Sequence, residues 1–186
     1  MEATRFTGLQ PYEGLRVSQE QYPGLPDDGH RYDMIDGVLH MSPSATPEHG
    51  WRQSRFVQLL NNHLDTRPVG RCMVEVDVLL PDGGDVLRPD ISSVGVERLH
   101  ILLNQIHGTP DLVCEILSES TAERNPGEKA LRYLNNGLLE YWIVDPSRRS
   151  IQLLVSQGSE WTYKTGNVLD SELLSGFQIN VERFFN

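Results

Sequence analysis

The stretch that decides the fold runs from Arg88 to Lys129, opening with RPDISSVG and closing with PDLVCEILSESTAERNPGEK. It places Asp90 at the head of one short apolar run, Glu115 inside the next, and Lys129 one turn into the helix expected after them. Carboxylate oxygens can hold a divalent metal that polarises a phosphodiester and acidifies a water, and a lysine beside them can stabilise the transition state. The pattern therefore predicts metal-dependent hydrolysis of phosphodiesters.

Length and composition fit one globular domain. The 186 residues are 38% hydrophobic and 23% charged, values typical of a soluble protein with a proper core. We expect a single nuclease-like domain over residues 1–186, with its core at about 31–145 and C-terminal β-hairpins at about 150–186. No apolar run approaches the roughly 18 residues that span a bilayer, and the N-terminal residues lack a signal-peptide pattern. These features predict a cytoplasmic protein with no membrane partner.

The charge balance restricts how nucleic acid can bind. A net charge of −10 argues against a broad basic binding surface, because phosphate contacts need local positive charge. A local basic groove remains open as an alternative. Cys72 and Cys114 lie in apolar, strand-like runs, which indicates small core residues rather than a redox pair or a zinc site.

Turn and capping signals divide the first third of the chain. A short helix is expected at Ser18 to Tyr22, before several proline and glycine residues. Asp36-Gly37 within RYDMIDGVLHMS predicts a two-residue β-hairpin turn. Thr46, followed by proline and an acid, predicts the cap of a long helix that reaches Asp65.

The middle of the chain predicts strands. RCMVEVDVLL (71–80) alternates for ten residues, and VLRPDISSV (86–94) should return antiparallel to it. A turn near Gly83 would place Asp77 roughly opposite Asp90. DLVCEILS is almost continuously apolar, as expected of a central strand covered on both faces.

The last third predicts one more helix and further strands. Asn125-Pro126 begins a helix that ends at Asn136-Gly137, and LEYWIVDP reads as a second central strand. IQLLV and EWTYKT then form a hairpin, before the terminal segment SGFQINVERFFN. The order of elements predicts an α/β fold with a mixed central sheet flanked by helices and hairpins added at both ends.

Each member of the candidate triad also has a structural interpretation. Asp90 follows a proline, and its structural alternative is a turn residue at the start of a strand. Glu115 falls in a strand expected to be central, where an unpaired ion costs several kcal/mol, so it needs a metal or a structural salt bridge. Lys129 alone would be a solvated helix residue. Their occurrence together favours the site.

Other polar residues are secondary candidates. Asp77 is either a solvent-facing acid or a carboxylate beside the metal, and Asp33 has no structural explanation and is expected to face the site. His49 could contact phosphate or transfer protons, although a histidine at a helix start is more often a capping or surface residue. The hydroxyls of Ser118, Ser120 and Thr121 are expected to cap the following helix rather than bind phosphate.

Three segments together resemble a known family: YDMIDGVLHMSPSATPEH, VDVLL with VLRPDISSV, and PDLVCEILSESTAERNPGEKALRYLNNGLLEYWIVDP. They are similar to the Uma-two family of restriction-endonuclease-like proteins in the PD-(D/E)xK nuclease superfamily. The resemblance implies a restriction-endonuclease-like core that binds Mg²⁺, with Mn²⁺ as an alternative, through Asp90, Glu115 and the carbonyl of Ile116. The superfamily lysine two residues after the acid is Leu117 here, and Lys129 resembles the migrated lysine of this family. Where the family carries a glutamate in its first hairpin, this chain has the shorter Asp33.

The sequence therefore predicts a metal-dependent DNA endonuclease, with Asp90, Glu115 and Lys129 as catalytic residues and Asp77 and Asp33 as auxiliary acids. Cutting both strands of DNA usually needs two sites, so a homodimer is expected. The alternative, from a different class, is a nuclease-fold module that has lost its chemistry and binds a protein or nucleic-acid partner. The two differ in whether the triad meets in space.

Overall fold

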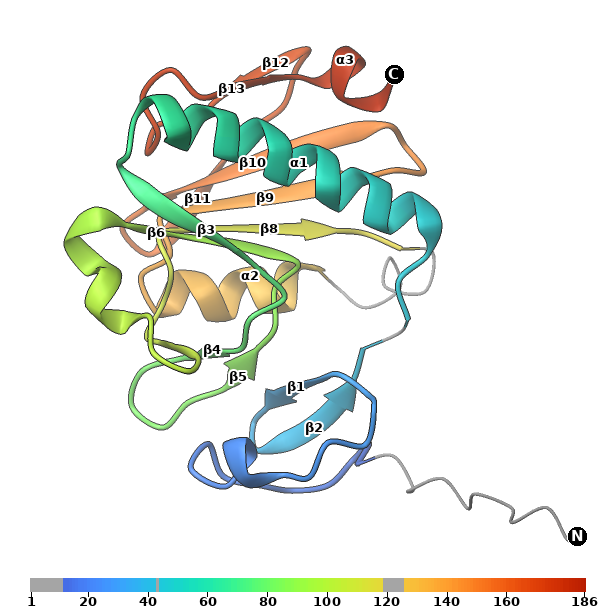
Figure 1. Ribbon diagram of the computed structural model, residues 1–186, viewed down its shortest axis with the longest axis vertical. Helices are drawn as coiled ribbons and strands as arrows, with labels where there is room; N and C mark the ends of the chain where they lie inside the picture. The colour runs from blue at the N-terminus through green and yellow to red at the C-terminus, as the bar shows by residue number, and fades with distance from the viewer. Residues whose placement is uncertain (1–11, 43, 119–125) are drawn as a thin grey trace, which may run out of the picture.

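A computed structural model describes residues 12–42, 44–118 and 126–186, which build two main β-sheets with helices around one of them (Figure 1). The larger sheet has the strand order β11-β10-β9-β8-β6-β3. Its strands are β3 (Gly70–Val74), β6 (Ile91–Gly95), β8 (Leu112–Ile116), β9 (Glu140–Asp145), β10 (Ser150–Gln157) and β11 (Glu160–Lys164). β8 and β9 are parallel and the other neighbours are antiparallel, so the sheet is mixed as predicted.

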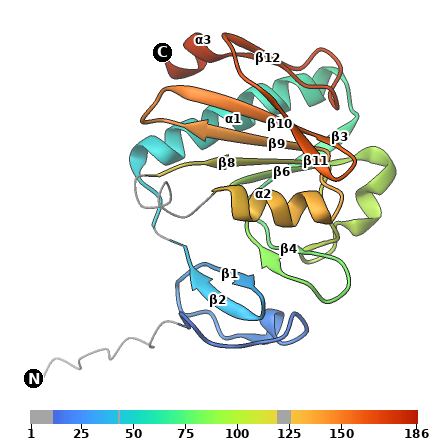
Figure 2. The same ribbon diagram turned by 180° about the vertical axis from the view of Figure 1, so that it is seen from behind.

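Two helices cover opposite faces of this sheet (Figures 1 and 2). On one face, Phe56 and Leu60 of α1 (Pro47–Thr66) pack in a buried cluster with Trp142 of β9. On the other face, Tyr133 of α2 (Pro126–Asn135) packs with Tyr141 of β9. Strand β8 is therefore enclosed on both sides, which explains its apolar sequence.

The helix boundaries agree largely with the sequence. Thr46 caps α1 by accepting a hydrogen bond from the His49 N–H at 3.2 Å, and α2 ends close to the predicted Asn136-Gly137. Asn125, Ser120 and Thr121, to which capping roles were assigned, lie outside the described residues. None of the helices in the described ranges combines the length and apolar character needed to cross a bilayer. The expected helix at Ser18 to Tyr22 is wrong: residues 19–21 form a turn, and a short 3-10 helix follows at Tyr22–Gly24.

The second sheet has the order β2-β1-β5-β4-β7 and lies below the first in Figure 1. Its strands are β1 (Tyr32–Ile35), β2 (Val38–Met41), β4 (Val78–Leu79), β5 (Val86–Leu87) and β7 (Ile106–His107). The predicted hairpin turn is confirmed, because Asp36 and Gly37 have φ values of 51° and 72°, as a type I′ turn requires. The N-terminal hairpin thus belongs to a different sheet from the one that carries Asp90 and Glu115.

The expected ten-residue strand over residues 71–80 is wrong. Glu75 adopts a φ of 54°, so the chain leaves the large sheet after β3 and enters the small one at β4. The returning segment divides in the same way, into β5 and β6, and a second 3-10 helix (Val96–Ile101) follows. One predicted hairpin therefore connects both sheets, and the break lies beside the candidate site.

The C-terminal segment extends and covers the large sheet. The β10–β11 hairpin forms one side of that sheet rather than a separate addition. β12 (Val168–Asp170) and β13 (Gln178–Asn180) form a two-stranded sheet, and α3 (Val181–Phe185) follows. Phe177 and Phe184 from this segment pack edge-on against Phe56 of α1, at ring-centroid distances of 6.2 and 6.5 Å. The α1 face of the sheet is closed by these contacts.

Candidate active site

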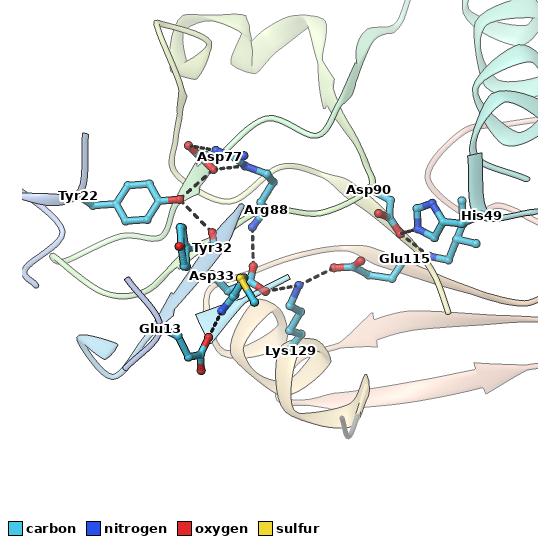
Figure 3. A network of polar contacts seen from close by, with 12 residues as sticks. Glu13, Tyr22, Tyr32, Asp33, His49, Asp77, Arg88, Asp90, Glu115 and Lys129 are labelled. Atoms are coloured by element: carbon cyan, nitrogen blue, oxygen red, sulfur yellow. Dashed lines mark hydrogen bonds and ion pairs between the residues drawn. The ribbon is translucent and has the colours of Figure 1, made fainter. Parts of the chain in front are cut away.

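Asp90 directly precedes β6, and Glu115 lies in the neighbouring strand β8. β6 and β8 are antiparallel with Ile91 opposite Cys114, so the next pair in the same register is Asp90 and Glu115. Figure 3 shows the two carboxylates close to each other, between His49 and Lys129. The strand pairing thus brings together two acids that are far apart in sequence.

Asp90 is held by two donors on a single oxygen. Its Oδ2 accepts a hydrogen bond from the main-chain N–H of Ile116 at 2.7 Å and lies 3.1 Å from Nε2 of His49 (Figure 3). The hydrogen bond with Asp90 raises the pKa of the His49 imidazole, although burial acts in the opposite direction. Because both contacts fall on Oδ2, the carboxylate is fixed in orientation through one oxygen only. His49 is thus a buried partner of Asp90 rather than a surface residue.

Lys129 connects Glu115 to the N-terminal hairpin. Its Nζ lies 3.3 Å from Oε1 of Glu115 and 2.8 Å from Oδ2 of Asp33 (Figure 3). Burial opposes the charge on Lys129, but the two carboxylates outweigh it and raise the pKa of the ammonium. Burial is the largest cause of the raised pKa of Glu115, which is about 8; Lys129 lowers this pKa, and Asp90 and Asp33 raise it further. Lys129 is thus a buried cation shared by Asp33 and Glu115.

Asp33 is placed by the hairpin and by Arg88. It sits in β1 with its side chain only 6% exposed, and its Oδ1 accepts the main-chain N–H of Arg88 at 2.8 Å. The Arg88 guanidinium binds both oxygens of Asp77, at 2.6 and 2.9 Å, and Tyr22 donates its hydroxyl to Asp77 at 3.3 Å. A chain of contacts therefore runs from Tyr22 to Glu115 across the boundary between the sheets.

The predicted position of Asp77 is wrong. The positive φ of Glu75 interrupts the strand, and the main-chain N–H of Glu75 donates to the carbonyl of Asp90 at 3.1 Å. Glu75, rather than Asp77, is therefore the neighbour of Asp90 on this segment. Asp77 precedes β4 in the other sheet and forms its ion pair with Arg88. Asp77 therefore contacts the guanidinium of Arg88 outside the cleft lining, and it does not lie opposite Asp90.

One cavity of about 810 Å³ lies between the hairpin and the large sheet, and it is lined by Asp33, His49, Arg88, Asp90, Glu115 and Lys129, but not by Asp77. Alternate residues along β1, β2 and their flanks contribute most of one wall, so one face of the hairpin lines the cavity: Arg31, Asp33, Ile35, Val38, His40 and Ser42. His30 and the turn residue Asp36 also line it. The opposite wall includes Glu75, Asp90 and Glu115. The candidate site is therefore a cleft between two sheets, with acids on both sides.

The donor set of the cleft fits a hard divalent cation. Mg²⁺ commonly binds through one or two carboxylates and keeps several waters, so Asp90, Glu115 and the Ile116 carbonyl suffice as protein ligands. Burial and the nearby Asp90 and Asp33 raise the pKa of Glu115, and a bound cation would favour its charged form. Within the described ranges, no three or more His, Cys, Asp or Glu side chains form a group that could hold a metal ion by themselves.

Sequence reasoning missed two residues of the cleft, Glu75 and Arg88, and one contact of a third, His49. Glu75 gave no turn signal, because a glutamate with positive φ is rare and its alternation looked like an ordinary strand. The role of Arg88 depends on the side-chain contact with Asp77 and cannot be read from spacing. His49 was considered, but its contact with Asp90 depends on where α1 crosses the sheet.

The mixed sheet between α1 and α2, with acids on adjacent strands at its edge, defines an α/β fold of the restriction-endonuclease-like class. The chain belongs to the Uma2 family, described as "Putative restriction endonuclease", whose profile matches residues 19–182. Among solved structures, it is similar to "a putative nuclease belonging to DUF820 from Anabaena variabilis", with a TM-score of 0.79 and 20% identity over 91% of this chain and 97% of that one. No curated protein sequence matches the chain. At this identity the structural likeness supports the fold.

Proposed function

We propose that this protein is a divalent-metal-dependent endonuclease that hydrolyses phosphodiester bonds of DNA. The observation that carries the proposal is the contact of Lys129 with both Glu115 and Asp33, next to Asp90. A nuclease-fold module without chemistry has no need to bury a lysine among acids, where desolvation costs several kcal/mol. Family membership supports the same reaction class.

Asp90, Glu115 and the carbonyl of Ile116 would hold Mg²⁺, or Mn²⁺ in its place. A bound divalent ion supplies charge stabilisation and lowers the pKa of a water. His49 and the Ile116 N–H fix Oδ2 of Asp90, which leaves the orientation of its second oxygen defined. Lys129 places a positive charge beside Glu115, where the charge of a scissile phosphate would grow.

Asp33 and Asp77 have auxiliary roles in this proposal. Asp33 orients the Lys129 ammonium from the hairpin side at 2.8 Å. Asp77 acts indirectly by fixing the guanidinium of Arg88, whose main-chain N–H holds Asp33. The proposal extends to a homodimer, since cutting both strands usually requires two sites; sedimentation velocity at assay concentration checks that part separately.

Cleavage of supercoiled plasmid DNA, titrated with MgCl₂ or MnCl₂, tests the proposed function. Asp90→Asn and Glu115→Gln should each abolish metal-dependent nicking while circular dichroism and thermal unfolding show a folded protein. The exposed residues Asp65 and Glu160 provide matched controls as Asp65→Asn and Glu160→Gln, which should cut at the parental rate. Parental cleavage by either site variant, or no cleavage by the parent at any metal concentration, would refute the assignment.

A further inference from the structure

The hairpin wall of the cleft carries an exposed guanidinium beside the acids. Arg31 lies two residues before Asp33, and both line the cavity because alternate residues of an extended chain point to the same side. The Arg31 side chain is 51% exposed, whereas the side chains of Arg88 and Lys129 are 25% and 24% exposed. Arg31 is thus much more accessible to a ligand than these two cations.

Arg31 forms an ion pair across the cleft. Its Nη1 contacts Oε2 of Glu75, so the pair joins the hairpin wall to the wall that carries Asp90. Glu75 is itself fixed: Gln53 donates to its Oε1 at 3.2 Å, and its main-chain N–H donates to the Asp90 carbonyl at 3.1 Å. The carboxylate that holds Arg31 therefore has a defined position next to a proposed metal ligand.

An ion pair of this kind exchanges readily. Solvent-exposed pairs contribute only about 0–1 kcal/mol, and a phosphate offers a guanidinium a bidentate partner of comparable or greater strength. The other arginines near the hairpin are held by more contacts, since Arg88 binds Asp77 through two nitrogens and Arg132 contacts three carboxylates. Arg31, by contrast, is half exposed and has one carboxylate partner among the described residues, on the cleft lining.

We propose that Arg31 binds a non-scissile phosphate of the substrate backbone and that Glu75 holds its guanidinium until the phosphate replaces it. This deepens the proposed function and rests on it, because a phosphodiester chain must enter the cleft. In a chain with a net charge of −10, a single exchangeable arginine at the entrance supplies the local positive charge that backbone binding needs. Glu75 then acts as a competitor of the phosphate.

Competition predicts opposite effects for the two partners. Arg31→Met should weaken binding of a short fluorescein-labelled oligodeoxynucleotide by about tenfold, the loss expected for one charged hydrogen-bonding contact. It should also reduce the slope of log affinity against log salt by about one. Glu75→Gln should strengthen binding, because it releases Arg31. Fluorescence anisotropy in EDTA measures these effects without cleavage.

The double variant separates competition from a general charge effect. If Glu75 acts through Arg31, Glu75→Gln should have little effect on affinity in the Arg31→Met background. Equal strengthening in both backgrounds would overturn the inference, as would parental affinity of Arg31→Met. Arg148→Met is the matched control, since Arg148 is 80% exposed, pairs with Asp145 and lies outside the cleft lining. It should reduce affinity far less than Arg31→Met.

The two proposals fail in different ways. Parental protein that cuts plasmid DNA while Arg31→Met binds and cuts like the parent would refute the role of Arg31 and leave the nuclease assignment intact. Parental protein that neither binds the oligonucleotide nor cuts DNA would refute both. Thermal unfolding of each variant establishes that it is folded, and Arg31→Lys, which retains the charge but not the bidentate geometry, should restore only part of the affinity.

Discussion

Arg132 of α2 and Asp36 of the hairpin turn form an ion pair with a nitrogen–oxygen distance of 2.8 Å. Lys129 and Asp33, which lie three residues earlier in the same two segments, form a second ion pair at the same distance. Arg132 also lies 2.5 Å from Asp85, whose carboxylate accepts the main-chain N–H of Asp36 at 2.7 Å. Two successive ion pairs therefore fix the hairpin against α2. The outer pair holds the hairpin at its turn, and the inner pair lies in the candidate site.

The first prediction concerns this outer pair. Arg132→Gln should lower the free energy of unfolding by about 1–3 kcal/mol, because Asp36 and the largely buried Asp85 lose their cation. Its kcat for DNA cleavage should fall with little change in KM, since Asp33 is then held less firmly against Lys129. Urea unfolding and steady-state nicking assays measure the two effects.

Glu128→Gln is the control for Arg132→Gln. Glu128 also contacts Arg132, at 3.1 Å, but its side chain is 58% exposed and such pairs contribute little. Stability and kcat should both stay close to the parental values. An Arg132→Gln variant with parental kcat would show that the hairpin does not need this anchor.

The second prediction tests the charge of Lys129. Lys129→Met should reduce the single-turnover rate of cleavage by roughly 10²-fold or more, the scale expected when one preorganised electrostatic group is removed. Magnesium affinity, measured by calorimetry, should not fall, because the lost group is a cation. Lys129→Arg should restore little activity, since a planar guanidinium cannot occupy the position between Asp33 and Glu115. Parental cleavage by Lys129→Met would end the proposed role.

The third prediction follows from the raised pKa of Glu115. In the folded protein this carboxyl keeps its proton to a pH of about 8, whereas in the unfolded chain it loses the proton near its model value of 4.5. Between these values the folded state binds more protons, so the free energy of unfolding should decrease as pH rises from about 4.5 to about 8. The loss should be on the order of 4 kcal/mol in metal-free buffer.

Urea unfolding in EDTA across this pH range measures the effect. Glu115→Gln should flatten that part of the profile, because it has no proton to release. Added Mg²⁺ should reverse the trend, since the ion binds the deprotonated carboxylate and stabilises the folded state more as pH rises. A parental profile with the same slope as that of Glu115→Gln would contradict the assignment of the titrating group.

The fourth prediction concerns His49 and the orientation of Asp90. His49→Leu removes the contact to Asp90 Oδ2 and leaves the Ile116 N–H as its donor in the described part of the chain. Affinity for Mn²⁺, followed by electron paramagnetic resonance, should fall by roughly 10-fold, as is typical when a group that orients a metal ligand is lost. His49→Gln retains an N–H donor and should recover part of the affinity. Parental affinity in His49→Leu would exclude an orienting role.

Local signals in the sequence predicted those parts of the fold that neighbouring residues determine. Asp36-Gly37 fixed the hairpin turn, because few residue pairs adopt two positive φ values, and Thr46 fixed the start of α1. The apolar run around Cys114 predicted the central strand β8. The placement of Asp33 beside Lys129 was expected only in outline, since it depends on how a hairpin in one sheet meets a helix on the other.

What the sequence did not reveal depends on long-range contacts. The alternation through Glu75 was read as one strand, but pairing with two different partners divides it between two sheets. Propensity carries little information about such a division, since β-structure depends strongly on context. The ion pair of Asp77 with Arg88 was missed for the same reason: an error in register moves every later side chain.

The division of the cleft between two sheets also has a consequence for the order of folding. Arg132 and Asp36, which join the hairpin to α2, are separated by 96 residues, whereas β8 and β9 are joined by a single helical crossover. Contacts between distant residues require closure of a long loop, so they tend to form after local ones. We therefore expect the chain to pass through states in which Asp90 and Glu115 are already neighbours but Asp33 has not yet reached Lys129. Asp90 and Glu115 would come together early, and the cleft would be complete only when the N-terminal hairpin packs against α2.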